Sequence, residues 1–257
     1  MILKDRVALI TGSTGGGMGR STALTLAKNG ADIVLNYGTN RRDAEADQSA
    51  KSVEKAIQDL GRRVVLIKAD TRKADEVSAM VKKAVSELGR IDILVNNAGG
   101  DWYLEDITEI PPEQFREVIE AEIDGVFHCI RECLPIMRKN LWGRIVNIGL
   151  FGAAGHWGDG SSGPLDYDIG KGARAILTRL LAFKERKYNI TVNLINPGPG
   201  HTAHIENVEK ALSFTDRSEE WRSRKQVTPQ DVAEAILFLC TEQARFVTGS
   251  NMNFSIE

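Results

Sequence analysis

Residues 6–37 read RVALITGSTGGGMGRSTALTLAKNGADIVLNY, and this stretch decides the fold class. It begins and ends with short runs rich in valine, leucine and isoleucine, RVALIT (6–11) and DIVLNY (32–37), which are typical of buried β-strands. Between them, a glycine-rich turn leads into a stretch with helical spacing of its apolar residues. A strand, a crossover helix and a second strand predict two parallel strands in one sheet.

The same alternation continues to the end of the chain. Amphipathic stretches at 75–89 and 229–240 have helical spacing. Five more apolar runs read as strands: VVLIKA (64–69), IDILVNN (91–97), RIVNIG (144–149), ITVNLIN (190–196) and FVTGSNMNF (246–254). We therefore predict an α/β fold, with one doubly wound parallel sheet of about seven strands and helices on both faces.

Residues 1–257 read as a single domain, because neither a repeat nor a linker divides them. Two irregular stretches, at about 150–166 and 198–227, begin where predicted strands end. Ligands of such folds bind beyond the carboxyl ends of the strands. We expect these two loops to form substrate walls; the alternative is that they are insertions without a ligand role.

Composition and charge exclude several classes of protein. The net charge is −2 at pH 7, so there is no electrostatic case for binding nucleic acid or an anionic membrane. No apolar run approaches the ~20 residues of a membrane helix. The three cysteines do not make a disulfide framework, and Cys129 and Cys133 fit packing on one helix face better than a metal site. The four histidines lack ligand spacing, so we predict no metal. We expect a cytoplasmic protein.

The turn TGSTGGGMG at residues 11–19 is a candidate nucleotide site. Its glycines would let the backbone approach a pyrophosphate at a helix N-terminus, although a flexible turn is the alternative. The next strand ends in LNYGTNRRD, which has no acid for a ribose 2′-hydroxyl and continues into Arg41 and Arg42. This pattern favours NADP(H) over NAD(H), unless the arginines are solvated charges at the start of a helix.

Tyr167 and Lys171 lie four residues apart at a predicted helix start, and therefore on one helix face. A free tyrosine ionises near pH ~10, and a neighbouring ammonium favours the phenolate. Such a pair can exchange protons with a substrate near neutral pH. Taken alone, it could also be an ordinary surface pair.

Four segments together resemble the short-chain dehydrogenase/reductase family. They are the TG…GMG turn (11–19), NNAG (96–99), YDIGK (167–171) and NPGPGHT (196–202). The resemblance implies a single Rossmann-type domain, hydride transfer between a nicotinamide and a carbonyl or hydroxyl carbon, and a homotetramer or dimer formed through helices predicted at 112–139 and 167–186.

The resemblance also implies roles for individual residues. Tyr167 would be the proton donor or acceptor, and Lys171 would hold the nicotinamide ribose. The cofactor contacts expected are Gly12, Ser13, Thr14, Gly17, Met18, Gly19, Asn36, Arg41, Asp70, Thr71, Asn97, Ala98, Gly99, Tyr167, Lys171, Pro197, Gly198 and Thr202.

Three positions depart from the family pattern. The glycine turn has one residue more than TGxxxGxG, and Leu150 stands where the family carries a catalytic serine. Loss of such a hydroxyl donor can cost ~10²-fold or more in rate. Glu122 replaces an asparagine whose backbone helps to hold a water of the proton relay, and its carboxylate could pair with Lys171 or join the relay.

The loop before Tyr167 offers replacements for the missing hydroxyl. Our hypothesis is that Ser161 or Ser162 folds back into the site, or that His156 supplies the donor; the alternative is a solvated loop. We expect a substrate surface lined by Trp102, Leu150, His156 and Trp157.

The function that we favour is an NADP(H)-dependent oxidoreductase that transfers a hydride between nicotinamide and a carbonyl or secondary alcohol. One alternative is a catalytically impaired nucleotide-binding protein that acts as a sensor or partner subunit. Another is reduction of a conjugated C=C bond, in which the serine is less needed. The expected partners are a small-molecule substrate and further copies of the chain.

Overall fold

The computed structural model describes residues 1–38, 43–100, 106–150, 165–197 and 227–254. All strands run parallel in one sheet of order β3-β2-β1-β4-β5-β6-β7, which confirms the predicted fold class. The strands are β1 (Val7–Ile10), β2 (Asp32–Tyr37), β3 (Val64–Lys68), β4 (Ile93–Asn96), β5 (Gly143–Ile148), β6 (Ile190–Asn196) and β7 (Asn251–Asn253).

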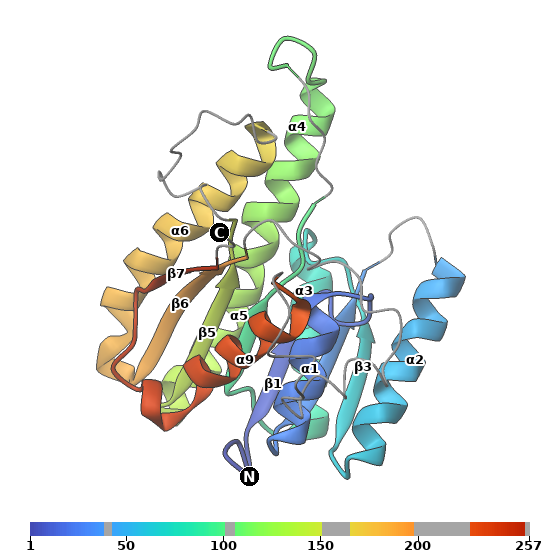
Figure 1. Ribbon diagram of the computed structural model, residues 1–257, viewed down its shortest axis with the longest axis vertical. Helices are drawn as coiled ribbons and strands as arrows, with labels where there is room; N and C mark the ends of the chain where they lie inside the picture. The colour runs from blue at the N-terminus through green and yellow to red at the C-terminus, as the bar shows by residue number, and fades with distance from the viewer. Residues whose placement is uncertain (39–42, 101–105, 151–164, 198–226, 255–257) are drawn as a thin grey trace.

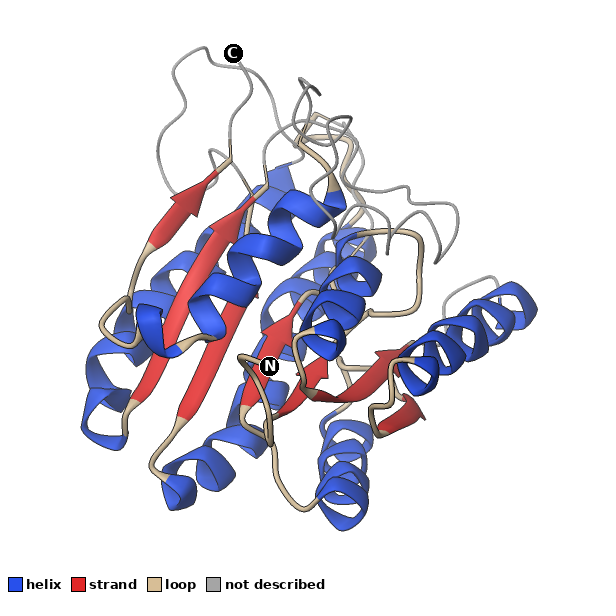
Figure 2. Ribbon diagram, turned by 60° about the horizontal axis from the view of Figure 1, so that its bottom comes forward, coloured by secondary structure: helices blue, strands red, loops and turns tan. Residues whose placement is uncertain are grey.

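The helices cover both faces of the sheet (Figures 1 and 2). One face packs against α1 (Met18–Lys28), α2 (Asp43–Asp59) and α9 (Pro229–Cys240). The other packs against α3 (Ala74–Leu88), α5 (Gly125–Asn140) and α6 (Leu165–Glu185). Successive β1 residues alternate between the two cores, which explains why the strand is apolar throughout.

Two predicted elements differ from the structure. The last strand is shorter than residues 246–254, because Gly249 has φ +72° and turns the chain before it pairs with β6 at Asn251. The helix predicted over 112–139 contains a π-helical turn. It runs as α4 (Pro112–Ile119), the π turn (Glu120–Asp124) and α5, and the turn places Glu122 beside α6.

The carboxyl ends of the central strands lie at one edge of the sheet. The predicted motifs at 11–19 and 96–99 follow β1 and β4, and α6 begins with the YDIGK motif. Sequence segments that lie far apart therefore meet at this edge. No helix in the described ranges is long and apolar enough to cross a membrane.

Candidate active site

The glycine-rich turn is shaped by two close approaches of the backbone. Gly12 has φ +61°, a conformation that favours glycine. A Cβ at Gly19 would collide with the carbonyl oxygen of Gly12 and would lie 2.6 Å from Asn97 Nδ2. Gly17 is the N-cap of α1 and makes no side-chain capping bond. The first turn of α1 is thus open to a ligand at its positive end.

Asn36 fixes this turn to the end of β2. Its Oδ1 accepts from the Gly12 N–H (3.3 Å), and its Nδ2 donates to the Ala69 carbonyl (3.0 Å). The Ser13 N–H donates to the Asn36 carbonyl (2.9 Å). Asn36 is buried, so its side chain supports the turn rather than pointing into an open site. Its direct contact with a cofactor stays a prediction.

Asp70 follows β3 at the same edge of the sheet. Arg72 binds its carboxylate with two nitrogens, Nε to Oδ1 at 2.9 Å and Nη2 to Oδ2 at 2.7 Å. The Arg72 hydrogen bond is the largest cause that holds the pKa of Asp70 below its ordinary value. The carbonyl oxygen of Thr71, the next residue, lies 3.2 Å from Nδ1 of the His128 ring.

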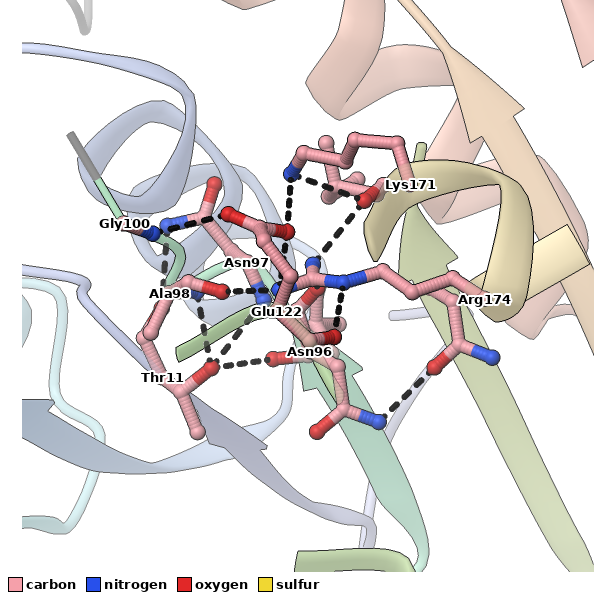
Figure 3. Close-up of polar contacts among 11 residues, drawn as sticks. Thr11, Asn96, Asn97, Ala98, Gly100, Glu122, Lys171 and Arg174 are labelled. Atoms are coloured by element: carbon pink, nitrogen blue, oxygen red, sulfur yellow. Dashed lines mark hydrogen bonds and ion pairs between the residues drawn. The ribbon is translucent and has the colours of Figure 1, made fainter. Parts of the chain in front are cut away.

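The NNAG segment connects the glycine turn with the π turn (Figure 3). Asn97 Nδ2 donates to the carbonyls of Thr11 and Gly12, each at 2.9 Å. The Ala98 N–H donates to Thr11 Oγ1 (3.0 Å). On the other side, the Gly100 N–H donates to Glu122 Oε1 at 2.7 Å.

The Tyr167 and Lys171 side chains project from the first turns of α6 and lie together. Lys171 Nζ is 4.8 Å from the centroid of the Tyr167 ring and donates to the carbonyl of Ile148 (3.3 Å). Lys171 is buried, whereas Tyr167 is partly exposed. The arrangement leaves the phenol accessible and the ammonium behind it.

Glu122 is fully buried and pairs with Lys171, at 3.0 Å between Oε2 and Nζ. One of the two alternatives from the sequence, pairing with Lys171, is therefore seen in the structure. Arg174 binds the same Oε2 at 2.7 Å. Figure 3 shows the carboxylate between the two cationic side chains. Burial lowers the pKa of Arg174, and Glu122 opposes this shift.

A family model described as enoyl-(acyl carrier protein) reductase matches residues 13–255. The chain is 32% identical to D-beta-hydroxybutyrate dehydrogenase of Rhizobium meliloti strain 1021, over 96% of each chain. It is 33% identical to 7alpha-hydroxysteroid dehydrogenase of Escherichia coli K12, over 98% of this chain and 94% of that one. The chain belongs to the short-chain dehydrogenase/reductase family.

Solved structures of this family share the whole fold. A double mutant of a short-chain dehydrogenase/reductase from Serratia marcescens has a TM-score of 0.81 at 27% identity, covering 99% of this chain and 98% of that one. A dehydrogenase/reductase from Sinorhizobium meliloti 1021 has a TM-score of 0.80 at 30% identity, covering 98% and 94%. The two relatives from Rhizobium meliloti and Escherichia coli are named as dehydrogenases, which supports an oxidoreductase.

Several expected short-chain dehydrogenase/reductase site residues lie outside the described residues. They are Arg41, Trp102, His156, Trp157, Ser161, Ser162, Gly198 and Thr202. Leu150 is described and partly buried directly after β5, and its side chain offers no hydrogen-bond donor. Pro197 is buried after β6. No cluster of metal-ligating side chains occurs among the described residues.

Sequence reasoning missed Arg174. The residue is buried, and its guanidinium reaches the ends of both β4 and β5. A signal was present in the sequence, because Tyr167, Lys171 and Arg174 are spaced i, i+4 and i+7 and share one helix face. An arginine on the same helix face as Tyr167 and Lys171 indicates that a second cation lies in the site beside Lys171.

Proposed function

We propose that this short-chain dehydrogenase/reductase is an NADP(H)-dependent oxidoreductase that transfers a hydride between nicotinamide and a carbonyl or secondary alcohol. The observation that carries the proposal is the partly exposed Tyr167 backed by the buried ammonium of Lys171, 4.8 Å from its ring centroid. Relatives named for the oxidation of hydroxybutyrate and of a hydroxysteroid support a secondary alcohol as the substrate class.

Tyr167 performs the proton transfer in this proposal. In the reductive direction its hydroxyl donates a proton to the substrate oxygen, and in the oxidative direction its phenolate accepts one. Lys171 stabilises the phenolate because its positive charge lies behind the ring. The bound nicotinamide supplies or accepts the hydride.

The residues at the glycine turn fit a dinucleotide. The φ of +61° favours glycine at position 12, the backbone at Gly19 leaves no room for a Cβ, and the uncapped start of α1 offers N–H donors to a pyrophosphate. Asp70 would lie at the adenine end, and Asn97 to Gly99 would line the ribose. These residues would hold the cofactor without large rearrangement, since hydrogen bonds already fix the turn to β2 and β4.

A preference for NADP(H) rests on the charges near the end of β2. Asn36 stands where an acid would bind the 2′-hydroxyl, and it is buried in the turn. Lys68 of β3 is the neighbour of Tyr37 in the sheet, with its Nζ 5.8 Å from the Tyr37 ring centroid. A cation here suits a 2′-phosphate, as Arg41 does in the sequence.

A second reaction, reduction of a conjugated C=C bond, is supported by Leu150. The serine hydroxyl normally stabilises charge on a substrate oxygen next to the hydride acceptor carbon, and leucine cannot do so. The family model that matches the chain carries the description of an enoyl reductase, which favours the same alternative.

We also propose that the enzyme is a homo-oligomer. Exposed apolar residues form a stripe along α6, spaced i, i+7, i+11 and i+14: Ile169, Ile176, Leu180 and Phe183. Phe127 on α5 is half exposed as well. A second copy of the same helices would bury this stripe.

Oxidation of NADPH, followed by absorbance, tests the function across saturated ketones, 3-oxoacyl thioesters and enones, with NADH in parallel. We expect turnover with at least one carbonyl substrate, and a loss of about 10²- to 10⁴-fold in kcat for Tyr167→Phe. Tyr188→Phe, a change at a tyrosine in the turn after α6, is the matched control and should keep wild-type turnover.

Equal turnover in Tyr167→Phe and wild type would contradict the proposed role of Tyr167. Tight NADPH binding without turnover on any substrate would instead support the sensor or subunit alternative. Turnover restricted to enones would select C=C reduction.

A further inference from the structure

Three buried charged side chains meet behind Tyr167. Lys171 and Arg174 both contact Glu122 Oε2, at 3.0 and 2.7 Å, and none of the three side chains is more than 3% exposed. Two cations and one anion sum to a single positive charge. That is the charge that a lone lysine would present to Tyr167 if residue 122 were the neutral asparagine of the family pattern.

Arg174 is held by more than its ion pair. Its Nε donates to the carbonyl of Glu122 (2.8 Å), and its Nη2 to the carbonyl of Ala98 (2.8 Å). Its Nη1 donates to the carbonyl of Ile148 (2.9 Å) and, at 3.4 Å, to that of Asn96. One guanidinium thereby joins the ends of β4 and β5 to the π turn, and all three nitrogens are used.

The Glu122 side chain packs closely against two glycines. A Cβ at Gly99 would collide with Glu122 Oε1, and a Cβ at Gly170 would lie 2.5 Å from Glu122 Cβ. Segments on two sides therefore pack Glu122 next to Lys171. Without a second cation, the negative charge of this buried carboxylate would cancel the positive charge that Lys171 presents to Tyr167.

We propose that Arg174 is a positioning residue that balances the charge of Glu122, so that Lys171 remains electrostatically available to Tyr167 and to the nicotinamide ribose. The inference rests on the proposed function for the role of Lys171. It predicts that Glu122 and Arg174 act as one neutral unit. Loss of Arg174 should lower the fraction of Lys171 present as the neutral amine, loss of Glu122 should raise it, and loss of both should leave it nearly unchanged.

The test is the acetylation rate of Lys171 by acetic anhydride in the full chain without cofactor, measured by mass spectrometry and normalised to the exposed Lys51. Only the neutral amine reacts, so the rate reports the charge around Lys171. Arg174→Met should slow the reaction about tenfold, and Glu122→Gln should speed it about tenfold. The double variant E122Q/R174M should return to within about threefold of wild type.

A merely structural role gives a different pattern. Loosened packing would expose Lys171 and speed its acetylation in both single variants, most of all in the double variant. That result, or unchanged rates in both single variants, would overturn the proposal. Arg144→Met, which removes a buried arginine at the opposite end of β5, is the matched control and should leave the Lys171 rate unchanged.

Folding of the variants is itself informative. If Arg174→Met is strongly destabilised, E122Q/R174M should recover part of the lost unfolding free energy, because it removes the unbalanced carboxylate even though four carbonyls still lack the Arg174 donor. A double variant that is no more stable than Arg174→Met would contradict the proposal. Neither the acetylation rates nor the stability measurements depend on turnover. The inference can therefore hold even if the NADPH assay on ketones and enones fails, and it can be wrong even if that assay succeeds.

Discussion

Arg144 and Arg174 are both fully buried arginines at opposite ends of β5: Arg144 belongs to the strand, and Arg174 reaches its carboxyl end from α6. Arg144, near the start of β5, stacks on Trp142, with Cζ 4.2 Å from the ring centroid, and pairs at 3.5 Å with Glu242, whose side chain is 60% exposed. Arg174 contacts the last residue of β5, and its carboxylate partner Glu122 is not exposed at all. The two sites therefore differ in their partners rather than in burial.

This difference separates a structural arginine from one in the candidate site. If Arg144 is removed, the partner carboxylate can turn to water, because Glu242 is already exposed. If Arg174 is removed, the carboxylate of Glu122 stays buried and four backbone carbonyls lose a donor. The buried carboxylate of Asp92 at the amino ends also pairs with two arginines, Arg6 and Arg90, but both of these are partly exposed. At the carboxyl ends the carboxylate and both of its cationic partners are buried.

The largest effect should come from the two arginines themselves. We expect Arg174→Met to lower the free energy of unfolding by about 3–5 kcal/mol, and Arg144→Met by about 1–2 kcal/mol. Urea unfolding followed by circular dichroism measures both. Equal losses would mean that burial, and not the partner, decides the energetics.

One glycine lies close to each arginine site, Gly170 beside Glu122 and Gly143 before Arg144, and replacing each by alanine compares how tightly the two sites are packed. Gly170→Ala places a Cβ against the buried Glu122 side chain and should cost about 2–3 kcal/mol of unfolding free energy. In Gly143→Ala the new Cβ meets Met137 Sδ at 2.8 Å, which can move aside, and lies 3.0 Å from Met137 Cβ, a tight contact that needs only a small shift. A cost of about 1 kcal/mol is expected there, and thermal unfolding of both variants gives the ranking.

The smallest effect should come from two buried cysteines, Cys129 near Arg174 and Cys240 near Arg144, and it should be equal for the two. Burial raises the pKa of Cys129 and of Cys240 from 9.0 to about 12, and Arg174 and Arg144 respectively oppose the shift. Because the folded state holds the thiol proton more tightly, this stability is complete below about pH 9 and is lost as the pH rises toward 12.

At pH 9.5 the free energy of unfolding should be about 1 kcal/mol lower per thiol than at pH 7. Urea unfolding of Cys129→Ala and Cys240→Ala at both pH values tests this, since each variant should lose its share of the pH dependence. Unequal shares would show that the two cores differ in dielectric environment as well as in partners.

Most of the sheet could be predicted from the sequence because both of its faces are covered. Strands such as β2 and β6 are then buried along almost their whole length and rich in valine, leucine and isoleucine, and their predicted ranges match the structure. The π turn could not be predicted, because it depends on packing between α6 and the helix that carries Glu122, not on local propensity. The turn at Gly249 shortened the last strand for a reason visible only in the backbone.

The sequence predicted which motif segments lie at the candidate site, and the structure places these segments at one edge of the sheet, but the charge balance was not predicted. Glu122 was recognised as a departure, and its pairing with Lys171 was one of two alternatives. Arg174 was missed because an arginine in a helix is usually solvated. Its burial follows from three separate segments, β4, β5 and the π turn, whose carbonyls need a donor at one point in space.

The close packing around Glu122 also constrains the order in which this protein can change during evolution. A Cβ at position 99 would collide with Glu122 Oε1, and one at position 170 would lie 2.5 Å from Glu122 Cβ, so a replacement at either position requires Glu122 to shift or to be shortened. A shortened, neutral residue at 122 would in turn leave Arg174 facing Lys171 without an anion between them. These four positions therefore form one unit, in which a change at any one of them alters the packing or the charge around Lys171.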